Sequence, residues 1–395
     1  MRRLYLNTGS FEFISRFLTW ARVLALGALV PVDGYGFILV LLGIEGLLAS
    51  VVAYPSVKDV LVRQDISVSV FRHFFLLFCI IALPVFFILL WVTDFSMLPT
   101  FVAIIAALLN GLSQVGLYML RVCDLSICNR TKIIWAFTTT AVMMVALPIH
   151  WALLPLVYVV GMIPIVASLV SFLRAPPFES AFVPVSGYHA RGWVIYGTQA
   201  LLNNFPQYGV RLFIAGNMAL SNVVAYTQTY MVSTAVFFGF SAIMLVLEPK
   251  LSRAGSDKEI AARLPLVLRV SAIFVLLTFG YAILISVVGR SEFYTDLVGT
   301  LIFIDQRLLL PIMVFVALNG VFTVVNCMVL AGFGRTISLL STALGSATLL
   351  ISLVISLPEP TLFGVGVAIA LSQGVSLAVL IIFLMRRFVK TDGLL

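Results

Sequence analysis

Long apolar runs recur along the whole chain and are separated by short polar segments. The runs are about 20 residues long, which is the length a helix needs to cross the hydrocarbon of a bilayer. They lack the short alternating pattern of a membrane β-barrel. The pattern predicts an all-α polytopic membrane protein with about twelve transmembrane helices. The expected helices cover residues 11–30, 36–54, 70–92, 98–121, 133–149, 151–172, 196–216, 219–247, 264–288, 308–332, 336–357 and 361–385.

The distribution of basic residues predicts how these helices are oriented. Lys and Arg gather in the loops on the side of the N-terminus, whereas the opposite loops hold only Arg290 and Arg307. Because basic loops stay on the cytoplasmic side, both termini are expected in the cytoplasm. An even number of helices agrees with this. We expect a multi-pass membrane protein.

The chain also shows two similar halves. We expect a six-helix bundle over 1–175, a cytoplasmic linker over 176–191 and a second six-helix bundle over 192–395. The first helix of each half carries a similar sequence motif, Ala21-Arg22-Val-Leu-Ala-Leu-Gly27 and Val210-Arg211-Leu-Phe-Ile-Ala-Gly216. With six helices in each half, the pseudo-symmetry axis runs along the membrane normal.

Composition supports this fold class and excludes several functions. Hydrophobic residues make up 62% of the chain and charged residues 10%, against about 25% charged residues in soluble proteins. The net charge of +8 is spread over loops and forms no continuous patch, so no nucleic-acid partner is expected.

The helix expected at 196–216 carries a polar stripe. At about 100° per residue its polar side chains fall within roughly 120° of one another. Hydrocarbon does not solvate such a stripe, so we expect it to line a cavity; alternatively, the amides only join helices. Pro206 is expected to kink this helix. The stripe consists of Tyr196, Gln199, Asn203, Gln207 and Arg211, with Asn204 beside it.

The first helix has a polar stripe of its own, which contains Glu12, Arg16 and Arg22. Glu12 and Arg16 are four residues apart and can pair. They can also lie at the cytoplasmic interface with their charges in water. Arg22 lies deeper and has no obvious local partner.

Glu45 is a carboxylate in the middle of the second apolar run. It is expected either to neutralise Arg22 or Arg211 as a structural counter-ion, or to titrate as an ion-coupling site. Asn110 and Gln114, four residues apart on the fourth helix, add a further polar face. Together the stripes predict a cavity between the halves with three arginines against one or two acids, which suits an anionic ligand.

Enzymatic chemistry is not expected. The chain has no Walker A loop, and its three histidines have no paired nucleophile. Cys123 and Cys128 lack the further ligands that a zinc site needs. We therefore expect no catalytic residue, no metal and no cofactor.

The N-terminal segment resembles that of Wzx-type polysaccharide flippases, in the multidrug/oligosaccharidyl-lipid/polysaccharide exporter superfamily. The sequence motifs that carry the resemblance are Ser15-Arg16-Phe17, the segment Ala21–Gly27 around Arg22, and Asp33-Gly-Tyr-Gly36-Phe37 at the start of the second helix. The six-plus-six layout and the restart at the seventh helix are similar as well. At the level of sequence motifs, the resemblance covers about the first 65 residues.

This resemblance implies a flippase in a bacterial inner membrane. It would move undecaprenyl-pyrophosphate-linked oligosaccharide from the cytoplasmic to the outer leaflet, as for O-antigen in lipopolysaccharide biosynthesis, by alternating access. Membrane lipid, and possible partners such as a polysaccharide polymerase and assembly proteins, would accompany it. The alternative is an ion-coupled drug or small-solute antiporter, MATE-like or major-facilitator-like. If the protein is a flippase, phosphates or acidic sugars would be bound by Arg16, Arg22 and Arg211. Sugar hydroxyls would be bound by Gln199, Asn203, Asn204 and Gln207, and the site would also be lined by Asn110 and Gln114. The ion-coupling residue would be Glu45.

Overall fold

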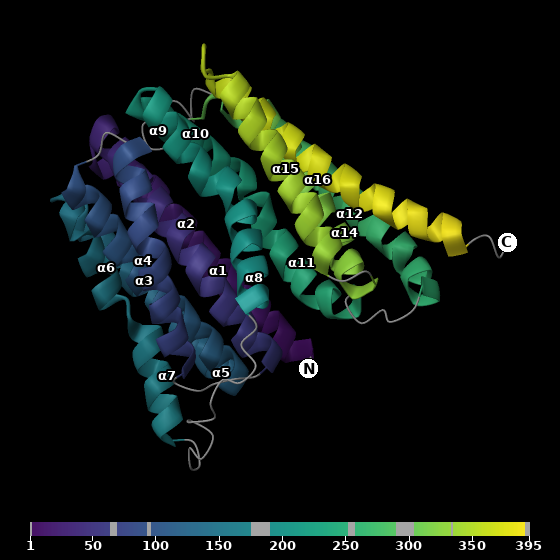
Figure 1. Ribbon diagram of the computed structural model, residues 1–395, viewed down its shortest axis with the longest axis horizontal. Helices are drawn as coiled ribbons and strands as arrows, with labels where there is room; N and C mark the ends of the chain where they lie inside the picture. Colours follow the sequence, from purple (N-terminus) through teal and green to yellow (C-terminus); the bar gives the residue numbers. More distant parts are fainter. Residues whose placement is uncertain are drawn as a thin grey trace. The chain divides into compact units, whose positions relative to one another are not determined.

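The computed structural model describes residues 2–63, 69–92, 96–174, 190–251, 257–289, 304–332 and 335–391. Within these ranges the chain is almost entirely helical and contains no β-strand (Figure 1). Continuous apolar runs satisfy their backbone hydrogen bonds internally as helices. The predicted all-α fold class is therefore confirmed.

Close packing divides the chain into two compact units, residues 14–224 and residues 1–13 with 225–395. These units are defined by contacts, whereas the predicted halves 1–175 and 192–395 rest on a sequence repeat. Most of the predicted linker, residues 176–189, lies outside the described residues. The pseudo-symmetric halves therefore stay a prediction.

The first unit is built around α2 (Val32–Arg63), which packs against α3, α4, α8 and α9. Helix α4 also contacts α5, α6 and α7. The other helices of this unit are α1 (Arg2–Leu29, whose first residues belong to the other unit), α3 (Ser69–Val92), α4 (Met97–Cys123), α5 (Leu125–Ala146), the short η1 (Trp151–Leu153), α6 (Leu154–Val160), α7 (Ile163–Arg174), α8 (Ala190–Asn204), η2 (Phe205–Gly209) and α9 (Val210–Asn217).

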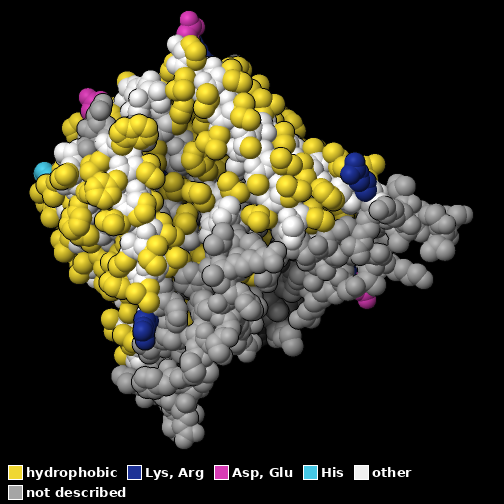
Figure 2. Space-filling model, in the orientation of Figure 1, with side chains coloured by type: hydrophobic (Ala, Val, Ile, Leu, Met, Phe, Trp, Pro, Cys, Tyr) yellow, Lys and Arg dark blue, Asp and Glu magenta, His cyan; other side chains and the backbone are white. Residues whose placement is uncertain are grey.

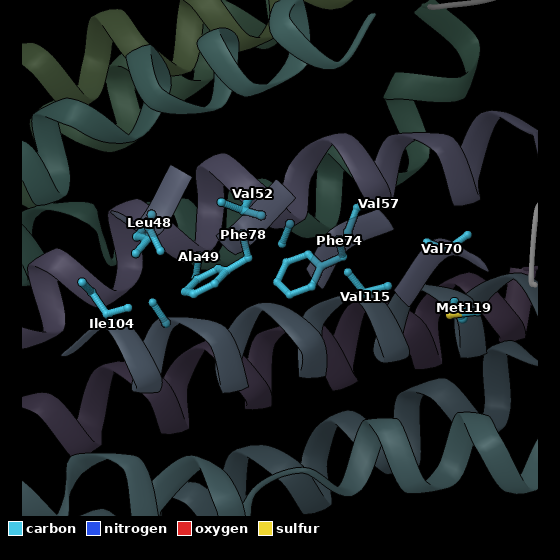
Figure 3. Packing of buried hydrophobic residues seen from close by; sticks show 13 residues of the cluster. Leu48, Ala49, Val52, Val57, Val70, Phe74, Phe78, Ile104, Val115 and Met119 are labelled. Atoms are coloured by element: carbon cyan, nitrogen blue, oxygen red, sulfur yellow. The ribbon is translucent and has the colours of Figure 1, made fainter. Parts of the chain in front are cut away.

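An apolar cluster holds α2, α3 and α4 together (Figure 3). The rings of Phe74 and Phe78 on α3 lie between Val52 of α2 and Val115 of α4, and all four side chains are buried. Gly111 gives Phe74 its place, because a Cβ there would lie 2.5 Å from the ring. Such tight packing fixes α4 against α2, the two helices that carry Asn110 and Glu45.

Polar and small residues set the helix ends in this unit. The carboxylate of Asp124 accepts hydrogen bonds from the backbone N–H groups of Ser126 and Ile127, at 2.7 and 3.1 Å, and caps α5. The side chain of His150 accepts from the N–H of Ala152 at 3.1 Å and begins η1. Helix α6 ends at Gly161, where a Cβ would collide with the methyl group of Thr139.

The second unit packs α14 against α16 and α12, and α15 against α16. The ring of Phe274 on α12 lies directly over Gly320 of α14, where any Cβ would collide with it. The helices are α10 (Leu220–Thr234, which begins in the first unit), α11 (Val236–Leu251), α12 (Asp257–Val288), α14 (Gln306–Gly332), α15 (Arg335–Ile355) and α16 (Leu362–Thr391).

Eight helical segments of the described residues are long and apolar enough to cross a membrane. The face in Figure 2 shows mainly hydrophobic side chains where residues are described, with few charged ones. This is the surface expected of helices in contact with lipid tails. The eight segments are Val32–Val57, Val70–Trp91, Met97–Cys123, Trp151–Ser171, Ala262–Val288, Gln306–Val329, Thr336–Ile355 and Leu362–Arg386.

The other four predicted transmembrane helices are helical but more polar or interrupted. They correspond to α1, α5, the series α8–η2–α9 and the pair α10–α11. Helix α1 carries Glu12, Arg16 and Arg22 within its apolar run. The series from α8 to α9 carries the predicted polar stripe. The two arginines Arg22 and Arg211 thus lie in helices that composition marks less clearly as membrane spans, whereas Glu45 lies in the clear span Val32–Val57.

Candidate functional site

The predicted polar stripe lies on a helix that is interrupted halfway. Helix α8 ends at Asn204, a π-helical turn covers Phe205–Gly209, and α9 continues from Val210. Pro206 lies in this turn and lacks the N–H that a regular α-helix would use there. Gly209 is required as well, because a Cβ at this position would collide with the ring of Phe205. The predicted disruption at Pro206 is confirmed, in the form of a π-helical turn.

The π-helical turn lies against two glycines of α2. A Cβ at Gly46 would lie 2.6 Å from the ring of Tyr208, and one at Gly43 would lie 3.6 Å from Cδ of Arg211. The guanidinium carbon of Arg211 lies 5.5 Å from the centre of the Tyr208 ring, a cation–π arrangement. Gly46 thus lets the Tyr208 ring, and Gly43 the Arg211 side chain, approach α2 close to Glu45 in the sequence.

Glu45 is the centre of a hydrogen-bonded group in the first unit. Its side chain is only 4% exposed. Oε1 accepts a hydrogen bond from Nδ2 of Asn110 on α4, and Oε2 accepts one from the hydroxyl of Tyr158 on α6, at 3.1 Å. Oδ1 of Asn110 in turn accepts from Nε2 of Gln114, at 3.2 Å. Three helices therefore converge on one carboxylate.

Arg22 approaches the same group from α1. One terminal nitrogen of its guanidinium donates to the hydroxyl of Thr139 on α5, at 3.1 Å. Its buried Nε has no hydrogen-bond partner among the described residues. Arg22 and Arg211 both act electrostatically on Glu45, and Arg211 is as buried as Glu45, at 4% exposed. Among the residues that the structure describes, Glu45 therefore lies within electrostatic reach of two guanidinium groups.

The remaining predicted site residues are less closely grouped. Gln199 is buried, Asn204 and Gln207 are half-buried, and Arg16 and Asn203 are exposed. The amide of Asn204 donates to the carbonyl of Ala200 within its own helix, at 2.9 Å. Their roles toward a substrate, and a cavity between the two halves, stay predictions.

Sequence reasoning missed three members of the group, namely Tyr158, Tyr208 and Thr139. Tyrosine and threonine are common in apolar helices, so neither residue type marks a site by itself. A signal existed for Tyr208, which lies in the polar stripe two residues after Pro206. Tyr158 and Thr139 lie 113 and 117 residues from their partners Glu45 and Arg22, and only the tertiary packing brings them together.

No protein-family profile matches the chain, and no curated protein matches it. Solved structures are similar in fold. A MATE protein in complex with MaL6 has a TM-score of 0.58 at 14% identity, over 99% of this chain and 97% of that one. MATE in the bent conformation gives 0.58 at 12% identity and MATE in the straight conformation 0.52 at 14%, each over 99% of this chain and 96% of that one. The neighbours are transporters, not enzymes, and over its whole length this chain has the fold of MATE transporters.

Proposed function

We propose that this protein is a secondary transporter, and that Glu45, Arg22 and Arg211 bind its substrate or its coupling ion. The observation that carries the proposal is the burial of Glu45 and Arg211 beside Arg22 inside a membrane-protein fold. An ionisable side chain in the middle of a membrane helix costs about 2.5–3.5 kcal/mol on insertion scales. Such residues are retained where they bind a substrate or an ion, and the MATE-like fold supports this reading.

The charge balance of the group favours an anionic substrate. Arg22 and Arg211 both act electrostatically on Glu45, and the sum of these three charges is positive, which favours a negatively charged ligand. Guanidinium groups bind phosphate and carboxylate strongly, often through two parallel hydrogen bonds. A transporter of cationic drugs would require the opposite sign in this part of the protein.

Two substrate classes follow from different observations. The N-terminal resemblance supports a flippase for undecaprenyl-pyrophosphate-linked oligosaccharide in a bacterial inner membrane, with Arg16, Arg22 and Arg211 on the phosphates. The likeness of the whole chain to MATE transporters gives more direct support to the alternative, an ion-coupled antiporter of drugs or small solutes. In both, Glu45 is the ion-coupling residue.

The deciding experiment is complementation of a bacterium that lacks its own oligosaccharide flippase. We expect wild type to restore surface polysaccharide and Arg211→Ala to fail at equal expression in the membrane. Arg121→Ala is the matched control, because Arg121 is exposed at the end of α4, and it should behave as wild type.

Each outcome either distinguishes the two substrate classes or rejects the proposed arginine site or the proposed function. If wild type restores nothing, proteoliposome efflux of small anionic dyes driven by a pH gradient tests the antiporter, with the same two variants. Restoration by Arg211→Ala as well as by wild type would keep the flippase and reject the arginine site. Absence of both activities would reject the proposed function.

A further inference from the structure

The two oxygens of the Glu45 carboxylate have chemically different partners. Oε1 accepts from the amide of Asn110, whose own oxygen is occupied by Gln114 at 3.2 Å. Asn110 therefore presents its NH₂ group to Glu45 and cannot turn round without losing Gln114. Oε2 instead faces the hydroxyl of Tyr158 at 3.1 Å, and a hydroxyl can either donate or accept.

This asymmetry makes Oε2 the oxygen that can take a proton with the smaller rearrangement. A proton on Oε1 would point at the amide hydrogens of Asn110, and keeping the network would then require the amides of Asn110 and Gln114 both to turn. A proton on Oε2 requires only that the Tyr158 hydroxyl rotate, so that its oxygen accepts instead of its hydrogen donating. Every hydrogen bond of Glu45 is then kept in both charge states.

Charged and hydroxyl groups of other helices surround this carboxylate, which is 4% exposed. Arg22 on α1 and Arg211 on α9 act on it electrostatically. The hydroxyl of Tyr158 on α6 contacts it, and the ring of Tyr208 in η2 lies against the adjacent Gly46. A buried ionisable group with such partners is a candidate for a change of charge during function.

We propose that Glu45 binds its coupling proton on Oε2, and that Tyr158 is the positioning residue that reverses its hydrogen bond when the proton arrives. The inference rests on the proposed function, in which Glu45 couples an ion, and assigns that ion as a proton. Protonation removes the negative charge on which Arg22 and Arg211 act. The proton and an anionic substrate therefore favour each other's binding, which is the behaviour of cotransport; in the antiporter alternative the proton would have to weaken substrate binding instead.

The test is an infrared titration of the purified full-length protein in lipid nanodiscs. A protonated carboxylic acid has a carbonyl stretch that a carboxylate lacks, and the band of Glu45 is identified by its loss in Glu45→Gln. In Tyr158→Phe the carboxylate loses a donor, so the midpoint of protonation should move up by about one to two pH units. The band should also move to higher frequency, because the acid has lost its acceptor.

Two further variants make the test specific. Tyr281→Phe removes a hydroxyl on α12 that donates to the carbonyl of Val232 at 3.0 Å, outside the Glu45 group, and should leave the midpoint unchanged. Fluorotyrosine at position 158 keeps the shape of the side chain but is a stronger donor, so its midpoint should move to lower pH. This variant also serves if Tyr158→Phe does not fold.

The proposal would be overturned by an equal shift in Tyr281→Phe, by no shift with fluorotyrosine, or by the absence of any band that Glu45→Gln removes. The last result would make Glu45 a permanent counter-ion. A protein that titrates as expected but moves neither glycan nor dye would instead reject the proposed function alone.

Discussion

The ring of Tyr208 lies so close to Gly46 that a Cβ on that glycine would be 2.6 Å from the ring. This contact joins the π-helical turn Phe205–Gly209 to the middle of α2, one residue from Glu45. It therefore couples the position of the interrupted helix, and of Arg211 at its end, to the carboxylate. The predictions below test this arrangement and the network around it.

Replacement of Gly46 should displace the interrupted helix. In Gly46→Ala the Tyr208 ring has to move, and overpacking of this kind costs about 1–3 kcal/mol. The displacement carries Arg211 away from Glu45, so transport should fall as well. Thermal unfolding in detergent measures the first effect, and the complementation assay the second.

Gly280→Ala is the matched control for this prediction. Gly280 lies in α12, and a Cβ there would meet nothing within 4 Å. An alanine in a helix interior is favoured over glycine by up to about 1 kcal/mol, so the control should be as stable as wild type or more so. Equal behaviour of the two variants would contradict the close contact at Gly46.

The hydrogen bonds that the side chain at position 45 makes should contribute more to stability than its charge does. Glu45→Leu leaves the amide of Asn110 and the hydroxyl of Tyr158 without their acceptor and the arginines without a counter-charge, which costs about 3–5 kcal/mol. Glu45→Gln keeps both hydrogen bonds, since its amide nitrogen can donate to the Tyr158 oxygen, and should cost about 1–2 kcal/mol. Unfolding of both variants under one set of conditions measures the difference; equal losses would show that the hydrogen bonds contribute little.

The cap of α5 offers a prediction outside the site. Asp124→Ala removes the acceptor for two backbone N–H groups and should cost about 1 kcal/mol. Asp124→Ser is the control, because a serine hydroxyl can still accept from the same positions. Hydrogen exchange at the start of α5, followed by mass spectrometry, should quicken in the alanine variant only. Equal exchange in both variants would argue against the cap.

Hydrophobic patterning predicted most helices well, but it missed helix boundaries that are set by capping residues and glycines. The run at 70–92 corresponds to α3 (Ser69–Val92), and the run at 308–332 to α14 (Gln306–Gly332). The helix expected at 133–149 begins eight residues earlier, at Leu125, because Asp124 caps it ahead of the apolar run. The helix expected at 151–172 is divided at Gly161, where only glycine fits beside Thr139.

The candidate site was predictable in its charges but not in its neutral members. Glu45, Arg22 and Arg211 are conspicuous because a charge in an apolar run is costly wherever the chain folds. Which helices bring them together, and that Asn110 and Tyr158 both bind the carboxylate, depend on tertiary packing. The glycines that admit Tyr208 and Arg211 leave no chemical signal in the sequence at all.

The last prediction concerns how acidity and anion binding are linked. Protonation of Glu45 removes a negative charge near Arg22 and Arg211, so an anion should bind more tightly as the pH falls through the protonation range of Glu45. Glu45→Gln is neutral at every pH, so its affinity should follow only the protonation of the anion itself. Isothermal titration of inorganic pyrophosphate, chosen because the proposed flippase substrate carries this group, measures both affinities across pH. Affinity for pyrophosphate that is independent of pH in wild type, or equally pH-dependent in Glu45→Gln, would show that Glu45 does not control the anion site.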